Sequence, residues 1–119
     1  MMQVGQSASV SRSYSRADLE DFAGLSGTAV PESIPEPLIA ALFSYLLGVE
    51  LPGPGTNYLK QELSFLAPAS PETELTAKVE ITRLRPEKHL VDLWATCTDA
   101  DGLLVCEGRS LVKAKDVTA

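Results

Sequence analysis

The sequence predicts an α+β domain in which an antiparallel β-sheet wraps around one long buried helix. Four consecutive segments in the second half of the chain alternate apolar and polar side chains with a period of two, which is typical of a sheet with one covered face. A stretch just before them has helical character and is apolar on nearly all sides, as a buried helix must be. The 119 residues match the size of one domain, residues 1–119, and the 45% apolar content suffices for a core.

A short strand and a short helix are expected first. Residues 7–14 alternate weakly and predict the strand. Ser15 then has the features of an N-cap, and Asp18, three residues later, completes a capping box whose carboxylate suits the positive end of a helix. Apolar side chains follow at helical spacing to about Leu25, so the helix should end at Ser26-Gly27.

The apolar helix is predicted over residues 37–47. Pro37 fits its first turn, where a missing N–H costs nothing, and Gly48 is a plausible stop. Because apolar residues occur almost all round it, we expect this helix to be buried on most sides. Residues 52–55, Pro-Gly-Pro-Gly, then form a loop.

Four strands complete the sheet. They are expected at residues 58–66, 74–84, 89–98 and 103–113. Asp101-Gly102 predicts a two-residue hairpin turn, which would place Cys97 opposite Cys106 on the core face, together with Leu104. The same register places Trp94 opposite Arg109 on the outer face, where a cation–π contact is expected.

Composition narrows the functional class. A net charge of −6 without a basic stripe disfavours nucleic acid, and residues 38–49, the longest apolar stretch, are too short to cross a membrane. Two cysteines support neither a disulfide framework nor a zinc site, and no metal-binding constellation is present. With no signal-peptide core, the chain is expected in the cytoplasm. A small sheet around one helix leaves an open edge and an apolar flank, which favours dimerisation.

Four stretches carry a more specific signal. They are residues 4–6, residues 22–27, residues 42–48 and residues 55–65. The last has the pattern Gly-Thr-x-Tyr-Leu-x-Gln-x-Leu-x-Phe and is the most specific. Together they resemble the MaoC-like, (R)-specific enoyl-CoA hydratase family over residues 4 to about 113, almost the whole chain.

The resemblance implies a hotdog fold, usually dimeric, that acts on acyl thioesters of CoA or acyl carrier protein in fatty acid metabolism. Members add water to an enoyl double bond or remove it from a 3-hydroxyacyl thioester, as hydratases and dehydratases of the lyase class, and need no cofactor or metal. The acyl chain lies beside the buried helix, whose N-terminus faces the thioester carbonyl and stabilises negative charge there.

The chain departs from the family where the chemistry is expected. The family carries Asp-x-Asn-Pro-x-His after the Ser-Gly of the first helix, followed by a long overhanging segment. Here residues 28–36 replace both, with Pro35 and Glu36 at the family's His-Gly pair, and the one histidine, His89, begins a distant hairpin. Hydration needs one group that accepts a proton and one that delivers a proton, each worth about 10²–10⁴ in rate. We therefore expect a hotdog protein without hydratase activity of its own, either an acyl-thioester binder or the non-catalytic partner of a catalytic hotdog subunit.

Two other interpretations stay open. In the first, Glu32 or Glu36 acts as base and Ser44 assists in a rebuilt hydratase, dehydratase or thioesterase site. The structural interpretation of the same residues is acids at a loop and at a helix N-terminus, and a serine bonded back to the carbonyl of Ala40. In the second, a homo-oligomeric protein holds a free fatty-acid-like ligand in its apolar groove.

Candidate substrate-binding residues come from two regions. Leu47, Tyr58 and Leu59 match positions that line the family's acyl pocket, although a leucine in an apolar helix is equally a core residue. Arg85 and Lys88 lie near one hairpin and are candidates for the phosphates of CoA, or simply solvated residues of that turn.

Overall fold

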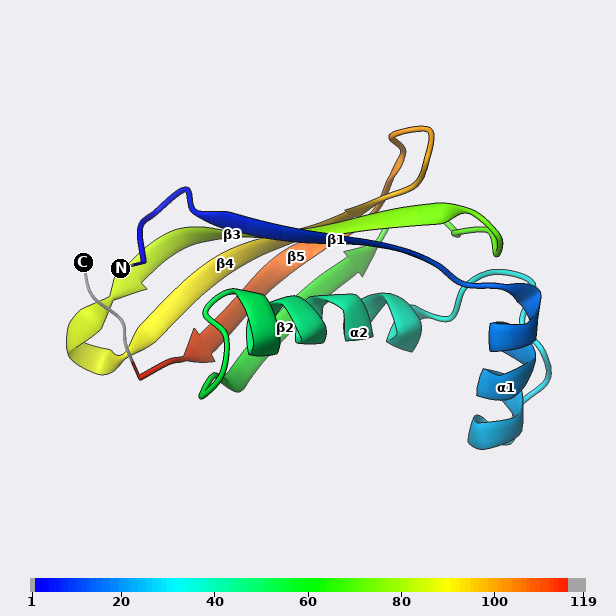
Figure 1. Ribbon diagram of the computed structural model, residues 1–119, viewed down its shortest axis with the longest axis horizontal. Helices are drawn as coiled ribbons and strands as arrows, with labels where there is room; N and C mark the ends of the chain where they lie inside the picture. The colour runs from blue at the N-terminus through cyan, green and yellow to red at the C-terminus, as the bar shows by residue number, and fades with distance from the viewer. Residues whose placement is uncertain (1, 116–119) are drawn as a thin grey trace.

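The computed structural model describes residues 2–115 and has the predicted α+β architecture (Figure 1). Its elements are β1 (Ser7–Ser13), α1 (Arg16–Ser26), α2 (Glu36–Tyr45), the π-helical turn η1 (Leu46–Glu50), β2 (Asn57–Phe65), β3 (Glu74–Arg85), the 3₁₀ turn η2 (Pro86–Lys88), β4 (Leu90–Thr98) and β5 (Leu104–Lys113). The strands form one antiparallel sheet in the order β1-β3-β4-β5-β2, so β1 and β2 are its two edges.

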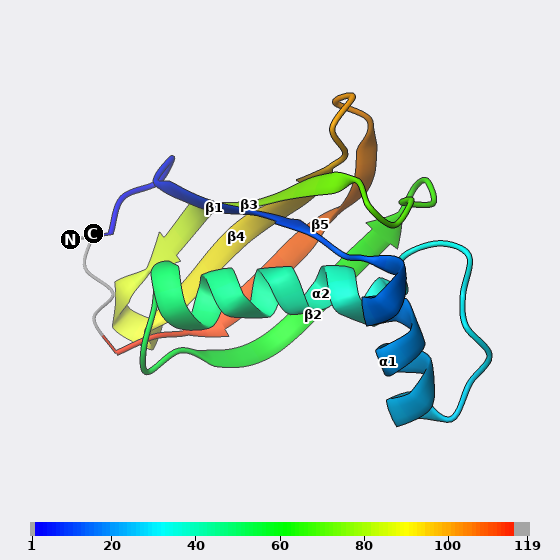
Figure 2. The ribbon, with the colours of Figure 1, turned by 45° about the vertical axis from the view of Figure 1, so that its right-hand side comes forward.

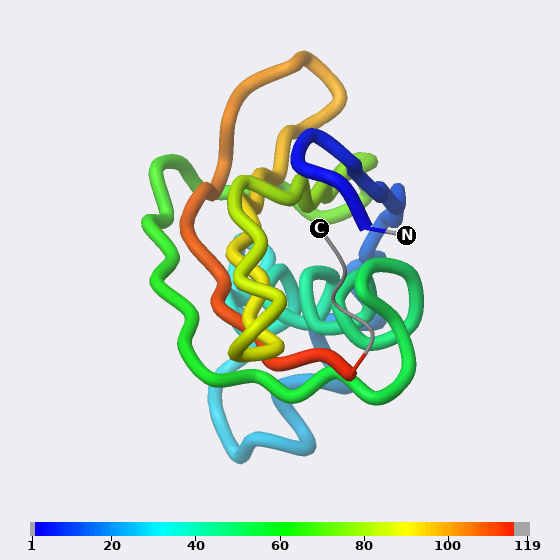
Figure 3. The backbone as a smooth tube through the Cα atoms, turned by 90° about the vertical axis from the view of Figure 1, so that its left-hand side faces the viewer, coloured from blue at the N-terminus to red at the C-terminus, as the bar shows by residue number. Residues whose placement is uncertain are grey.

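The core lies between α2 and the face of the sheet that curves around it (Figures 1 and 3). The inward side chains of β3 are fully buried, as their alternation predicts: Leu75, Ala77, Val79 and Ile81. The sheet covers only one side of α2, however. Phe43 is fully buried, whereas Ser44 and Tyr45 on the next positions are exposed. The expectation of a helix buried on most sides is therefore wrong for the single chain.

The helix boundaries follow local signals except at one point. The Ser15–Asp18 capping box forms at the start of α1, and Gly27 ends α1 in the left-handed conformation, as predicted. Gly48 does not end the second helix. The chain continues through η1, where the N–H of Leu51 donates to the carbonyl of Leu46 over 2.7 Å. This wide turn buries Leu51, a packing gain that the glycine signal does not contain.

The β4–β5 hairpin keeps the predicted register but not the predicted loop. Cys97 lies opposite Cys106 and Trp94 opposite Arg109. The turn has three residues, Ala100 to Gly102, because the N–H of Asp99 donates to the carbonyl of Leu103. A bulge next to Cys97 restores the register, and it buries Val105 in place of Leu104. The expected cation–π contact is replaced, since the Arg109 guanidinium binds Asp92.

A second bulge shapes the edge strand β2. Tyr58 pairs with Val112 and Lys60 with Leu111, so Leu59 is the extra residue of the bulge. The alternation predicted from the sequence is therefore displaced at this point, and Tyr58 rather than Leu59 shares the inner face with Gln61. Gly108 of β5 allows the close approach of this strand, because a Cβ there would lie 1.8 Å from the carbonyl oxygen of Glu62.

The connection between the two helices is short. Residues 27–35 form an open loop that leads from the end of α1, which projects beyond the sheet, to the first turn of α2 (Figure 2). Within residues 2–115, no helix has both the length and the apolar character that crossing a membrane would require.

Candidate functional site

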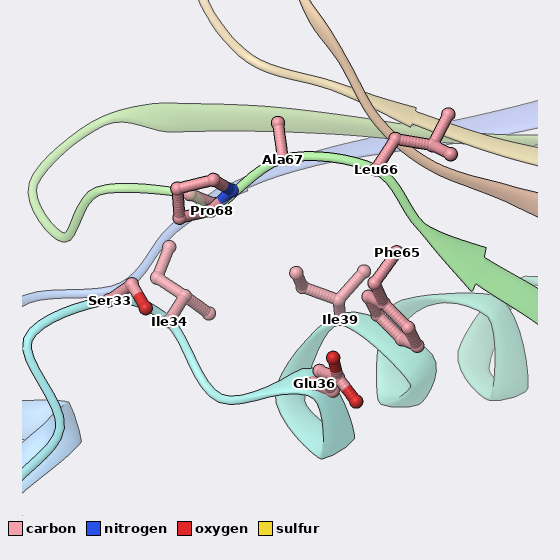
Figure 4. A pocket seen from close by; sticks show the side chains of 9 residues that line it. Ser33, Ile34, Glu36, Ile39, Phe65, Leu66, Ala67 and Pro68 are labelled. Atoms are coloured by element: carbon pink, nitrogen blue, oxygen red, sulfur yellow. The ribbon is translucent and has the colours of Figure 1, made fainter.

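Two cavities lie along the flank of α2 that faces the edge strand β2, and we call this flank the α2–β2 seam. The first, of about 300 Å³, is at the N-terminal end of α2 beside Glu36 and Phe65 (Figure 4). The second, of about 330 Å³, lies beside Ser44 and Tyr58. Glu36 and Ser44 lie eight residues apart on one helix face, which corresponds to about 12 Å along the axis. The seam therefore has two separate polar points.

Most of the residues that line the N-terminal cavity are apolar, and backbone hydrogen bonds hold its walls in place. The N–H of Ile34 donates to the carbonyl of Ala69 over 2.8 Å, and that of Leu66 donates to the carbonyl of Val105 over 2.8 Å. Among the described residues that line the cavity, only Glu36 is ionisable (Figure 4). A carboxylate accepts hydrogen bonds but cannot donate them when ionised, so this end of the seam opposes any group that carries developing negative charge.

The second cavity contains a neutral hydrogen-bond network. Gln61 Nε2 donates to Tyr58 Oη over 3.2 Å and to the buried Ser110 Oγ over 3.1 Å. Burial raises the pKa of Tyr58, against the opposing effect of hydrogen bonds from Ser44 and Gln61, so the phenol stays protonated at neutral pH. Because Tyr58 Oη accepts from Gln61, the phenol keeps its own O–H as a donor beside Ser44, which lines the same cavity.

The predicted site residues are only partly brought together. Ser44, Tyr58 and Leu59 line the second cavity, and Glu36 lines the first. Leu47 is fully buried in the core and lines neither seam cavity.

The remaining candidates lie elsewhere. Glu32 is exposed in the loop between the helices and lines neither seam cavity. Lys88 is exposed in η2, and Arg85 donates from Nη2 to Asp92 Oδ2 over 2.6 Å. The guanidinium of Arg85 is thus occupied within the protein.

The one histidine lies outside the seam. His89 follows η2 with a positive φ of 56°, and its Nδ1 is 3.2 Å from the carbonyl oxygen of Lys115. It lines a third cavity, of about 260 Å³, together with Asn57 and Lys113. In the part of the chain that the structure describes, no group of three His, Cys, Asp or Glu side chains could hold a metal ion.

Sequence reasoning missed a charged cluster on the outer face of the sheet. Asp92 of β4 is 5% exposed and receives hydrogen bonds from Arg85 and from Arg109, whose Nε lies 2.8 Å from Oδ1. Burial by itself would raise the pKa of Asp92, but the hydrogen bonds and charges of the two guanidinium groups outweigh it and lower the pKa. The alternation of β4 places Asp92 on the face of Arg109 and could have indicated the pair.

Comparison with known proteins gives close relatives. No family model matches the chain. An (R)-specific enoyl-CoA hydratase from Rhodospirillum rubrum is 39% identical over 126 residues, which cover 93% of this chain and 87% of the relative. One from Aeromonas caviae is 36% identical over 127 residues, covering 94% and 95%. The solved structure of an (R)-hydratase from A. caviae involved in PHA biosynthesis superposes with a TM-score of 0.90 at 35% identity, covering 96% of this chain and 98% of that one.

The alignment lengths show that the two relatives are longer than this chain within the matched region. Both sequence alignments run over more residues than the 119 that the chain contains. The two relatives therefore have residues inside the matched region that have no counterpart here.

Proposed function

This chain belongs to the (R)-specific enoyl-CoA hydratase family, and from that premise we propose that residues 1–119 form a single hotdog domain that binds acyl thioesters without hydrating them by itself. It acts in the cytoplasm as an acyl-thioester-binding protein or as the non-catalytic partner of a catalytic hotdog subunit. The observation that carries the proposal is the position of His89, the one imidazole of the chain, which lines neither cavity of the α2–β2 seam.

Hydration requires a base for water and an acid for the α-carbon at the same double bond. Among the described residues of the seam, the groups that could transfer a proton include the Glu36 carboxylate, the Ser44 and Tyr58 hydroxyls and the Lys60 ammonium, which is paired with Glu62 over 2.8 Å. Glu36 and Ser44 are about 12 Å apart along the helix, too far to act on two adjacent carbon atoms. With each missing proton-transfer group worth about 10²–10⁴ in rate, this arrangement supports binding rather than turnover.

The short connection between α1 and α2 accounts for the loss. The family motif Asp-x-Asn-Pro-x-His belongs directly after the first helix, where this chain has only residues 27–35 before α2. We place the residues that the relatives have in excess at this connection. Their loss removes the acid–base pair and leaves the N-terminal cavity of the seam open.

The thioester carbonyl binds at the Ser44–Tyr58 end of the seam. The Tyr58 O–H at this end can donate a hydrogen bond to a carbonyl oxygen. At the other end, the Glu36 carboxylate would repel the partial negative charge of a carbonyl oxygen. The acyl chain then extends towards Phe65 and Ile39, which line the apolar N-terminal cavity. The carrier of the thioester is CoA or acyl carrier protein.

A second hotdog subunit covers the open side of the seam, as a homodimer or a heteromer. β2 is an edge strand with an unpaired side, and the neighbouring apolar side chains Leu59 and Val49 are 53% and 55% exposed. An unpaired edge beside exposed apolar surface favours strand-to-strand association.

The direct test measures crotonyl-CoA with the isolated protein in two ways. Calorimetry should show saturable binding, while the enoyl absorbance should stay constant. Native mass spectrometry after mild purification then separates a retained thioester from a free fatty acid. Efficient hydration that co-purifies with the chain and responds to Tyr58→Phe would contradict the proposal, because a contaminating hydratase would not respond.

A gain-of-function variant sharpens this test. The segment that the A. caviae relative carries between the positions matching Gly27 and Glu36 is inserted into this chain in place of residues 28–35. If the rest of the site is intact, the insertion should raise hydration by at least about 10², the minimum worth of one positioned proton-transfer group. A folded chimera that binds crotonyl-CoA and shows no gain would mean that the deficit lies elsewhere.

One observation favours a second candidate, an enzyme with a rebuilt site such as a thioesterase. The Glu36 carboxylate lines an apolar cavity, and hotdog thioesterases can work with a single carboxylate. In that case Glu36→Gln should abolish thioester hydrolysis or hydration, whereas the matched change Glu32→Gln in the exposed loop should not. Unchanged turnover in Glu36→Gln would remove this candidate.

A further inference from the structure

The third cavity gathers positive charge at the end of the sheet where β2 begins and β5 ends. It is lined by Asn57, His89, Lys113 and Lys115, with Gly55 and Ala114 between them. The chain has only ten lysines and arginines against sixteen acids. Two lysines in a single concavity, with no carboxylate among its described lining residues, are therefore a local reversal of the overall charge.

Three segments far apart in sequence fix the shape of this cavity. Asn57 lies opposite Lys113 in the β2–β5 ladder. The carbonyl of His89 accepts the N–H of Ala114 over 2.9 Å, which ties the β3–β4 turn to the end of β5. The stem of Lys115 lies against Gly55, since a Cβ on that glycine would be 4.0 Å from Cδ.

The polar groups of the cavity are mostly donors. The contact between His89 Nδ1 and the carbonyl oxygen of Lys115, at 3.2 Å, requires the proton on Nδ1, because a carbonyl only accepts. The ammonium groups of Lys113 and Lys115 are donors without an acceptor function, and the Asn57 amide adds two further N–H groups. No carboxylate occurs among the described residues that line the cavity.

We propose that this cavity is a binding site for the phosphate group of a small molecule, with Lys113 and Lys115 as the charged contacts and Asn57 as a neutral donor. The oxygens of a phosphate accept several hydrogen bonds, and charge-assisted bonds to ammonium groups are the strongest available to them. The inference goes beyond the proposed function, because a phosphate can bind here whether or not an acyl chain occupies the seam. It also replaces Arg85, whose guanidinium is held by Asp92, as the candidate phosphate contact.

His89 provides a reporter for this site that does not depend on activity. It is the one histidine of the chain, so its ring gives a single set of signals in NMR spectra. Titration with adenosine 3′,5′-bisphosphate should move these signals in a saturable manner. Lys113→Ala and Lys115→Ala should each weaken binding about tenfold, since a lost charge-assisted hydrogen bond corresponds to about one factor of ten.

The matched control is Lys78→Ala. Its ammonium is exposed on β3 and lies 3.5 Å from Glu80, so its removal should leave the dissociation constant unchanged. Urea unfolding checks that each variant is folded. Lys113→Gln keeps a polar side chain but removes the charge, so it should weaken binding as Lys113→Ala does if the charge is responsible. A shift of the His89 signals that does not saturate, or equal binding in Lys113→Ala, Lys115→Ala and Lys78→Ala, would overturn the inference.

Two further titrations identify the source of the phosphate. CoA that binds more tightly than 3′-dephospho-CoA assigns the site to the 3′-phosphate of CoA, whereas saturation by inorganic phosphate with no such preference assigns it to free phosphate. Both results uphold a phosphate site. Because seam binding is measured separately with Tyr58→Phe, lysine variants that bind crotonyl-CoA and phosphate like the wild type would overturn this inference and leave the proposed function standing.

Discussion

Two polar networks are built on the two faces of the same sheet, and they differ in how completely they are satisfied. On the outer face, Asp92 receives hydrogen bonds from two guanidinium groups, those of Arg85 and Arg109. On the inner face, Gln61 donates to Tyr58 and Ser110, next to Ser44 and an open cavity. In the outer network both oxygens of the Asp92 carboxylate are bound by charged donors, although Arg85 Nε has no partner among the described residues. The inner network is neutral, and the Tyr58 O–H remains available as a donor.

Because of this difference, we expect the two networks to affect different properties of the protein, its stability and its ligand binding. A buried carboxylate held by two cations costs much to disrupt, because removal of one partner leaves the other charges without compensation. A neutral network at the edge of a cavity costs little to change, and its unspent donor can serve a ligand. We therefore expect the outer network to set the stability of the β4–β5 core and the inner network to set ligand affinity.

The largest effect is expected from Asp92→Asn. It leaves two guanidinium groups without their shared carboxylate and should lower the free energy of unfolding by about 2–3 kcal/mol, since both arginines can reach solvent. Urea unfolding measures the change, and crotonyl-CoA affinity should stay the same. Glu80→Gln, which removes an exposed pair with Lys78, is the control and should cost less than about 1 kcal/mol.

Tyr58→Phe is expected to lower ligand affinity and to leave stability nearly unchanged. It removes one hydroxyl from the seam and should weaken crotonyl-CoA binding about tenfold, the worth of about 1.4 kcal/mol. Stability should change by less than about 1 kcal/mol, because the ring stays in place. Tyr45→Phe, on the opposite flank of α2, is the matched control. Equal affinity of the two variants would show that the phenol does not contact the ligand.

The outer network should also give the protein an acid-sensitive part of its stability. The pKa of Asp92 is lower in the folded chain, so as the pH falls through the ordinary aspartate range near ~4 the unfolded state takes up the proton first. The contribution is present above that range and is lost progressively down to the folded pKa. The difference in the free energy of unfolding between the wild type and Asp92→Asn should therefore begin to shrink below about pH 5 and keep shrinking as the pH falls towards the folded pKa. A constant gap would contradict the assignment.

The smallest effect of a seam substitution is expected on the reactivity of the two thiols in the core. Burial raises the pKa of Cys97 and of Cys106 to about 11, and both side chains are 0% exposed. At pH 8 about one thiol in a thousand is ionised, so a disulfide reagent should react with the folded protein only slowly. Tyr58→Phe should leave this rate within about twofold of the wild type. A fast reaction in the wild type would show that the β4–β5 hairpin opens locally.

Most of the secondary structure could be predicted from the sequence because helix caps and strand alternation are set by residues close together in the chain. The Ser15–Asp18 capping box and the alternation of Leu75 to Ile81 each depend on a few neighbouring residues, and both appear in the fold. The turn after Thr98 and the bulge at Leu59 were not predicted, since a bulge adds one residue to one strand and is decided by the partner strand. That bulge is also what turns Tyr58 towards Ser44 and creates the inner network.

The sequence by itself determined the order of the elements, the core face of β3 and the lack of an Asp-x-Asn-Pro-x-His motif after the first helix, because these depend on periodicity and on which residues are present. Only the tertiary structure decided which polar residues meet. Arg85 and Arg109 lie 24 residues apart in the chain and converge on Asp92, and the ends of β2, β4 and β5 bring Asn57, His89 and Lys113 to one cavity. These contacts between residues far apart in the sequence follow from strand order and register, which are set by the packing of the whole sheet around α2.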